Sequence, residues 1–316
     1  MKVALITDKS GMEPYYAVDN KIYRLDNDRP YIHEQSLSNE CIMGFWNIPV
    51  LFDGWFLNSQ HMAPENFPEI DFDLIFVSHQ RQDTNIPISF LRKKYPNAII
   101  SSITQETFTD HNVLYENFRH CDIVCGCYSD VERYDDIMNK IDKKMHWVPE
   151  PFNVDYLHEK FYTGEKDLSI FSYRHHRPQR LGHTENFANY IGSKYNIPVV
   201  RKWTECVDNQ WKDFLDMWTP CAYHFNLDPE PHPGDQAIQC AIMGTINVGG
   251  NNDSHKILFP ETFGNDLTLL EQQMDVYLND PSAYHNAIVY AWNKVNEIYS
   301  FDAVRNRILN MVGEYQ

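Results

Sequence analysis

The stretch DPEPHPGDQAIQCAIMGTINVGGNND, residues 228–253, contains the order of elements that decides the fold. A polar, proline-rich loop at residues 228–234 leads into a short helix whose apolar side chains recur on one face. Residues 245–248 have the apolar composition of a buried strand, and residues 249–253 form a tight polar loop. Loop, helix, strand and loop in this order are typical of an α/β protein. The apolar face of the helix consists of Ala237, Ile238, Ala241 and Ile242.

The two ends of this helix suggest what it does. Asp235 is placed to cap its start, and Gly244 is placed to end it in a left-handed conformation. The first turn offers unpaired N–H groups and the positive end of the helix dipole, and Gly234 lets a phosphate approach the backbone. The stretch therefore predicts an anion site at the start of the helix. The alternative is an ordinary βαβ unit whose polar loop is only solvated.

Length and composition indicate a globular protein of more than one domain. The 316 residues suffice for two domains with separate cores, and the content of 43% hydrophobic and 14% aromatic residues argues against disorder. No apolar run approaches the ~20 residues of a membrane span, and residues 1–11 indicate a first strand and not a signal peptide. The seven cysteines lack the spacing of a disulfide framework or a zinc site. We therefore expect reduced thiols, no metal and a cytoplasmic location.

The formal net charge of −17 disfavours non-specific attraction to nucleic acids or to anionic membranes. It does not exclude a local basic cleft, because the basic residues are unevenly distributed. Three arginines and three histidines fall between residues 174 and 183. A second basic set in the first half of the chain consists of Arg81, Arg92, Lys93, Lys94, Lys143 and Lys144.

Apolar runs along the chain predict parallel strands covered on both faces. In the first half they lie at residues 3–7, 48–52, 74–78, 98–103 and 123–128, and in the second half at residues 168–172, 198–203 and 222–227. His79 and Glu106 follow two of the first-half strands, so both are expected at the carboxyl edge of the sheet, where ligands bind in α/β proteins. The alternative for each is an ordinary polar surface loop.

These features resemble the GT-B fold of nucleotide-sugar glycosyltransferases, in the large retaining family with an E-x7-E motif. The resemblance covers about residues 70–280 and is most specific at residues 228–253. Counted back from Gly244, the second acidic position is occupied by Gln239 and the first by Pro231, with Glu230 one residue out of register. The chain departs from the motif at both acids. Gln239 still offers a donor and an acceptor to a ribose hydroxyl, and Asp235 is another candidate for the sugar-facing carboxylate.

The resemblance implies two Rossmann-like domains facing a central cleft. Residues 1–160 would form the acceptor-side domain, and residues 161–316 the donor domain, with terminal helices that pack back on the first. Residues 148–151, VPEP, are similar to the crossing between the domains in this family. Arg174 matches the first of two basic residues that grip the donor diphosphate, and Arg177 or Arg180 is the second.

The implied function is transfer of a hexosyl or pentosyl group from a nucleotide diphosphate sugar, most simply a UDP-sugar, to a hydroxyl. The resemblance points to retention of configuration and to no required metal or other cofactor, because basic residues and a helix dipole stabilise the leaving diphosphate. Candidate catalytic residues are His79, Glu106 and Asp235. Candidate donor-binding residues are Arg174, Arg177, Arg180, Glu230, His232, Gly234, Asp235, Gln236 and Gln239.

More than one acceptor is compatible with this donor chemistry. The chain resembles phage-encoded glycosyltransferases, some of which modify hydroxymethylated pyrimidines in viral DNA, which would place it in the host cytoplasm. Such a reaction needs double-stranded DNA as a partner and extrusion of the target base. The alternatives are a glycan, lipid-linked or small-molecule acceptor, or a nucleotide-sugar epimerase or binding protein on a similar fold.

Overall fold

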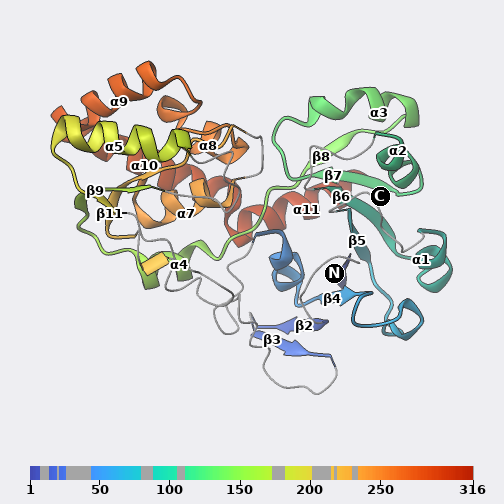
Figure 1. Ribbon diagram of the computed structural model, residues 1–316. Helices are drawn as coiled ribbons and strands as arrows, with labels where there is room; N and C mark the ends of the chain where they lie inside the picture. Colours follow the sequence, from blue (N-terminus) through green and yellow to red (C-terminus); the bar gives the residue numbers. More distant parts are fainter. Residues whose placement is uncertain are drawn as a thin grey trace. The chain divides into compact units, whose positions relative to one another are not determined.

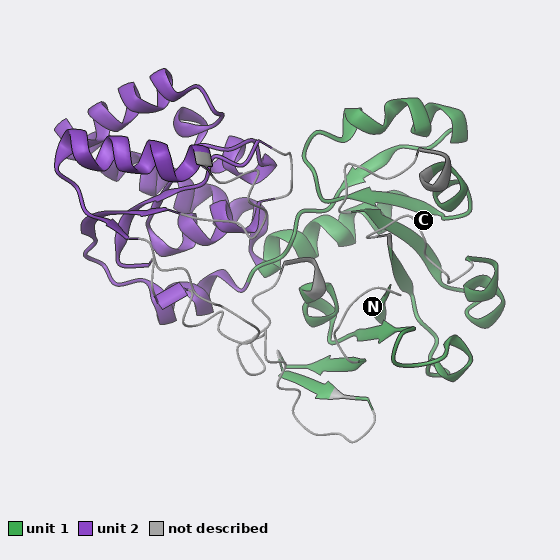
Figure 2. Ribbon diagram, viewed as in Figure 1, with its two compact units in different colours: residues 1–152, 301–316 green, residues 153–300 purple. Residues whose placement is uncertain are grey.

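The computed structural model describes residues 1–7, 14–19, 21–25, 44–79, 88–104, 111–172, 182–200, 215–216, 219–229 and 234–315. The chain divides into two compact units (Figure 2). Unit 1 comprises residues 1–152 and 301–316, and unit 2 comprises residues 153–300. Unit 1 is thus made from both ends of the chain, and unit 2 from its middle.

Unit 1 is built on an eight-stranded sheet in the order β3-β2-β4-β1-β5-β6-β7-β8 (Figure 1). Its strands run parallel except that β2 pairs antiparallel with β3 and β4. The strands are β1 (Val3–Thr7), β2 (Tyr15–Val18), β3 (Lys21–Arg24), β4 (Trp55–Asn58), β5 (Leu74–His79), β6 (Ile99–Thr104), β7 (Ile123–Gly126) and β8 (Met145–Trp147). The helices are η1 (Gly44–Phe52), η2 (Pro64–Asn66), α1 (Ile88–Lys94), α2 (His111–Arg119), η3 (Val131–Tyr134), α3 (Asp135–Ile141) and α11 (Phe301–Tyr315).

The prediction of a strand at residues 48–52 is wrong, because these residues form the 3₁₀ helix η1. Pro49 lies inside η1 and lacks the N–H that a central strand would need. The Pro49 carbonyl instead accepts from the Gly54 N–H at 2.8 Å, and this turn leads into β4. The hairpin of β2 and β3 was not predicted either. The other first-half strands are confirmed within two residues at each end.

The core of unit 1 lies on both faces of this sheet. Along β1, Val3 and Leu5 belong to one buried cluster, and Ala4 and Ile6 belong to another, as the alternation of side chains in a strand requires. Helix α11 contributes to the first cluster the four residues Val304, Ile308, Met311 and Val312, spaced at i, i+4, i+7 and i+8. The Sγ of Cys125 on β7 lies 3.3 Å from the Sδ of Met311. The last helix of the chain is therefore part of the core of unit 1.

Unit 2 contains a four-stranded parallel sheet in the order β10-β9-β11-β12. Its strands are β9 (Asp167–Ser172), β10 (Val199–Val200), β11 (Cys221–Phe225) and β12 (Ile246–Val248). Its helices are α4 (Val154–Phe161), α5 (Gly182–Tyr195), α7 (Asp235–Met243), α8 (Asp253–Leu258), η5 (Pro260–Thr262), α9 (Leu267–Asn279) and α10 (Pro281–Tyr299). No helix in the described residues is long and apolar enough to cross a membrane.

Candidate functional site

The candidate site lies at the start of α7, where the chain leaves the carboxyl ends of the parallel strands of unit 2. Ser172 at the end of β9 pairs with Phe225 of β11, which in turn pairs with Val248 of β12, so the three strands end at one edge. The loop after β11 leads to Gly234, the N-cap of α7. In α/β sheets this edge, with a helix N-terminus beside it, is where anionic ligands bind.

The predicted role of Asp235 as the helix cap is wrong. The N-cap is Gly234, which is left-handed at φ 95° and has no side chain with which to cap the helix. Asp235 is the first residue of α7, where its charge still complements the helix dipole. At the other end, the predicted role of Gly244 is confirmed. This residue is left-handed at φ 70°, and its N–H donates to the carbonyl of Cys240.

Two polar side chains of the next helix pack against Gly234. A Cβ on Gly234 would lie 2.4 Å from Asn252 Oδ1 and 2.4 Å from Ser254 Oγ, so only glycine fits. Ser254 Oγ donates to the Gly234 carbonyl at 2.5 Å, and Asn252 caps α8 by accepting from the His255 N–H at 2.9 Å. The starts of α7 and α8 are thereby joined through side chains. Helix α8 was not predicted, although Asn252 followed by Asp253 is a recognisable helix start.

Several amide side chains lie on α7 or next to its start. Gln239 is 4% exposed, and among the described residues its Oε1 has no hydrogen-bond partner. The fully buried Asn252 Nδ2 likewise has none in the part of the chain that the structure describes. Asn226, which follows β11, donates to Gln236 Oε1 at 2.7 Å. Buried polar atoms without partners are rare and costly in folded proteins, and they are one mark of a site that receives a ligand.

A series of hydrogen bonds joins four fully buried polar side chains next to this site, those of His224, Asn247, His255 and Thr262. His224 of β11 and Asn247 of β12 are joined by a 2.9 Å bond from Nδ1 to Oδ1, and Asn247 Nδ2 lies 3.0 Å from His255 Nδ1. An amide oxygen only accepts and an amide nitrogen only donates, so His224 carries its proton on Nδ1 and His255 on Nε2. His255 Nε2 then donates to Thr262 Oγ1 at 3.2 Å, and Thr262 Oγ1 donates to the Asn247 carbonyl at 2.6 Å. Burial lowers the pKa of His224 to about 4 and that of His255 to about 3, so both rings are neutral.

The structure brings four of the predicted site residues together on the first turns of α7: Gly234, Asp235, Gln236 and Gln239. His79 ends β5 in unit 1, where it pairs with Thr104 of β6. The described residues contain no cluster of three or more His, Cys, Asp or Glu side chains that could hold a metal ion. The remaining predicted residues lie outside the described residues, namely Glu106, Arg174, Arg177, Arg180, Glu230 and His232.

No protein-family model and no curated protein sequence matches the chain. Among solved structures, trehalose-6-phosphate synthase OtsA aligns with a TM-score of 0.56 at 12% identity, over 78% of this chain and 72% of that one. A glycosyltransferase from Rickettsia africae aligns with a TM-score of 0.53 at 12% identity, over 77% of each chain. An alpha-glucosyltransferase in complex with UDP and a 13-mer DNA containing a HMU base aligns with a TM-score of 0.50 at 11% identity, over 77% of this chain and 81% of that one.

Identities this low establish the fold alone. The α/β fold predicted from the sequence is confirmed, and it is the GT-B fold of glycosyltransferases.

Gly234→Ala tests how tightly the start of α7 is packed. Gly164 provides a matched control, because it also has a positive φ, 75°, but no atom lies within 4 Å of a Cβ built there. We expect Gly164→Ala to cost about 1–2 kcal/mol of unfolding free energy from backbone strain alone. Gly234→Ala should cost about 1–3 kcal/mol more, because its methyl group collides with Asn252 and Ser254. If urea unfolding gives the same loss of unfolding free energy for both variants, the packing of Gly234 against Asn252 and Ser254 is not tight.

The two buried histidines should make the protein sensitive to acid. The unfolded chain protonates them below pH ~6.5, whereas the folded chain resists protonation until about pH 4 or 3. Their stabilisation is thus complete above pH ~6.5 and is lost as the pH falls towards 4. Between pH 7 and pH 5 the two together should reduce the unfolding free energy by about 4 kcal/mol.

His255→Gln should remove about half of that contribution, roughly 2 kcal/mol, while carboxylate titrations remain common to both proteins. Urea unfolding at pH 5 and pH 7 measures the difference. A pH dependence that is the same in His255→Gln as in the wild type would contradict the neutral buried pair.

Proposed function

We propose that this protein is a glycosyltransferase that moves a sugar from a UDP-sugar to a hydroxyl acceptor. The observation that carries the proposal is the start of α7, where a glycine has no room for a side chain and the buried oxygen of Gln239 has no hydrogen-bond partner among the described residues. The GT-B fold of the chain supports it. So does the similarity to a glucosyltransferase structure that contains UDP.

In this proposal the first turn of α7 binds the donor diphosphate. The N–H groups of Ala237 and Ile238 turn back to the Gly234 carbonyl, at 3.1 and 3.5 Å. The N–H groups of Asp235 and Gln236 precede them on the first turn and are the proposed donors to phosphate oxygens. Arg174, Arg177 and Arg180 follow β9 in the sequence, and guanidinium groups bind phosphate oxygens in pairs. With this much positive charge, we expect the enzyme to need no metal for donor binding.

Gln239 lies one helical turn beyond Asp235 and Gln236, on the same side of α7. We propose that its Oε1 accepts from a ribose hydroxyl of the donor, which would give this buried oxygen its partner. Asp235 is the proposed sugar-facing carboxylate. Unit 2 is then the donor-binding unit and unit 1 the acceptor-side unit, with His79 and Glu106 as its candidate catalytic residues.

Gln239→Leu separates this role from a role in folding. We expect UDP affinity to fall about fivefold to thirtyfold, because a buried hydrogen bond to the ligand is lost at a cost of about 1–2 kcal/mol. The melting temperature should not fall, since the substitution also removes a buried oxygen that has no partner in the part of the chain that the structure describes. Calorimetric titration with UDP measures the affinity. Gln272→Leu on the exposed side of α9 is the control, and an unchanged affinity in Gln239→Leu would remove this residue from the site.

For the acceptor we propose hydroxymethylated pyrimidine in DNA. The support is the sequence resemblance to phage-encoded enzymes and the similarity of fold to the glucosyltransferase bound to HMU-containing DNA. Several of the basic residues considered for DNA contact are engaged within unit 1. Arg92 pairs with Asp122 at 2.6 Å, and Lys94 pairs with Glu69 at 2.7 Å. Lys143 donates to the Phe118 carbonyl at 3.0 Å. Arg81, Lys93 and Lys144 are therefore the proposed DNA contacts in this set. With so few basic side chains, the protein should neutralise few DNA phosphates.

The acceptor is tested with a DNA duplex that contains one hydroxymethyluracil or hydroxymethylcytosine, incubated with a mixture of UDP-sugars. Nucleoside mass spectrometry should show a hexose or pentose adduct on the hydroxymethylated base and none on a matched thymine duplex. Failure to modify DNA while a glycan, lipid-linked or small-molecule acceptor is glycosylated would refute the DNA acceptor and retain the glycosyltransferase. If no UDP-sugar binds at all, the proposed function itself is wrong.

A further inference from the structure

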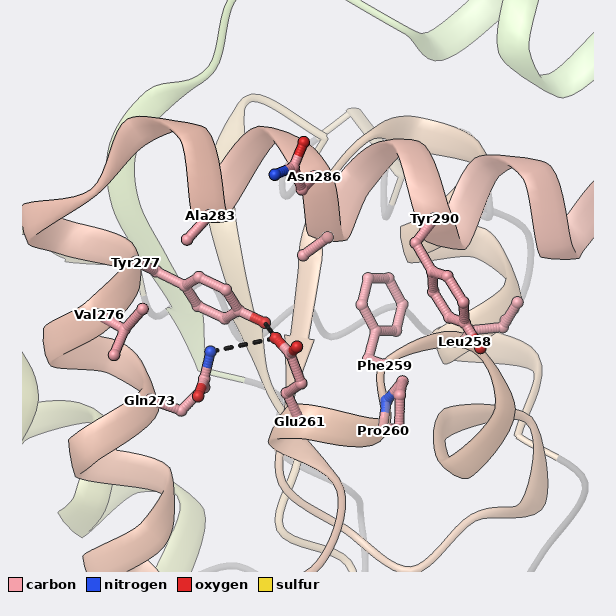
Figure 3. Close-up of a pocket in the computed structure, with 11 residues that line it drawn as sticks. Leu258, Phe259, Pro260, Glu261, Gln273, Val276, Tyr277, Ala283, Asn286 and Tyr290 are labelled. Atoms are coloured by element: carbon pink, nitrogen blue, oxygen red, sulfur yellow. Dashed lines mark hydrogen bonds between the residues drawn. The ribbon is translucent and has the colours of Figure 1, made fainter.

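Unit 2 contains a hollow that is lined by residues outside α7. It has a volume of about 600 Å³ and is formed by η5, α9 and α10 and the end of α8 (Figure 3). This volume is within the range of small-molecule sites, roughly 300–1,000 Å³. No residue of α7 lines it. The side chains that matter for its chemistry are Phe259, Glu261, Gln273, Val276, Tyr277 and Tyr290.

The carboxylate of Glu261 is held in a fixed orientation at this hollow. Its Oε2 accepts from the Tyr277 hydroxyl at 2.7 Å and from Gln273 Nε2 at 3.1 Å, as the dashed lines in Figure 3 show. Burial raises the pKa of Tyr277 above its usual value, so the phenol keeps the proton that it donates. Both bonds go to Oε2. Among the described residues, no group donates to Oε1 and none forms an ion pair with Glu261.

The charge at the hollow has one sign. Glu261 is the only charged side chain among the described residues that line it, and no Lys, Arg or His accompanies it. A phosphate or carboxylate ligand would be repelled there, so the hollow is unsuited to a nucleotide sugar. A cation, in contrast, would be attracted to Glu261 Oε1, which accepts from no described residue, because opposite charges near a protein surface attract each other.

Apolar and aromatic surface adjoins this carboxylate. Ala283, Ala287 and Tyr290 are spaced at i, i+4 and i+7, so they share the side of α10 that faces the hollow. The ring of Tyr290 is 43% exposed and Val276 is 45% exposed, which leaves both able to contact a ligand. An aromatic face also attracts an ammonium group. The hollow therefore combines one oriented negative charge with a hydrocarbon wall.

We propose that this hollow binds a small organic ammonium compound, in which a primary amine is joined to an aromatic or aliphatic group. The ammonium donates to Glu261 Oε1, and the hydrocarbon part packs on Tyr290. This site does not depend on the proposed glycosyltransferase activity, because it shares no residue with the start of α7.

The test uses the full chain and benzylamine as the probe, with benzyl alcohol as its uncharged counterpart and methyl glucoside as a neutral sugar. Protein-observed NMR titration at pH 7 should show saturable benzylamine binding, and benzyl alcohol should bind at least tenfold more weakly. Glu261→Gln should weaken benzylamine binding at least tenfold, because glutamine keeps the shape of the side chain but not its charge. Glu297→Gln is the matched control, since Glu297 is on α10, pairs with Lys294 at 2.7 Å and does not line the hollow.

Tyr290→Ala provides a second variant that leaves Glu261 intact, and it should weaken benzylamine binding at least threefold. It decides the matter if Glu261→Gln fails to fold. The proposal is overturned if benzylamine does not saturate, if benzyl alcohol binds equally well, or if folded Glu261→Gln and Tyr290→Ala both bind like the wild type. Saturable binding of methyl glucoside without binding of benzylamine would instead assign the hollow to neutral sugars.

Discussion

The arrangement of unit 2 depends on the side chain of Asn247, which links β11 to α8. Its oxygen accepts from His224 on the neighbouring strand, and its nitrogen donates to His255 on α8. Since each of these hydrogen bonds has a fixed direction, only one tautomer of each neutral histidine can form them. This series of hydrogen bonds therefore holds α8 against the edge of the sheet. Asn252 and Ser254, at the start of α8, in turn determine the space available at Gly234.

Unit 1 is held together mainly by apolar packing. The chain leaves this unit after residue 152 and returns to it at residue 301. Helix α11 then buries Val304, Ile308, Met311 and Val312 against the cluster that contains Val3 and Leu5 of β1. One face of the sheet is thus completed by the end of the chain, so this core cannot be complete until the middle of the chain has been made. Both units bury apolar surface, and unit 2 adds directional hydrogen bonds between buried polar side chains.

Local signals made much of this fold predictable. Apolar runs located β1, β5 and β6, and the left-handed Gly244 followed from residue type and spacing. Residues 48–52 were mispredicted because a buried apolar run is common to strands and to other buried segments, and Pro49 decided the outcome. The packing of Gly234 against Asn252 and Ser254 was unpredictable for another reason. It joins segments whose proximity only the tertiary fold creates.

The E-x7-E resemblance leads one to expect an acid where this chain has Gln239, and the structure gives a physical reason why an amide suits this position. Gln239 is 4% exposed, and a carboxylate buried that deeply without a cation would be strongly destabilised. An amide avoids that cost and still offers an oxygen acceptor. Asn226, Gln236 and Asn252 add further uncharged dipoles near the helix start. The attraction for an anion can then come from the helix itself and from basic residues after β9, without a second negative charge opposing it.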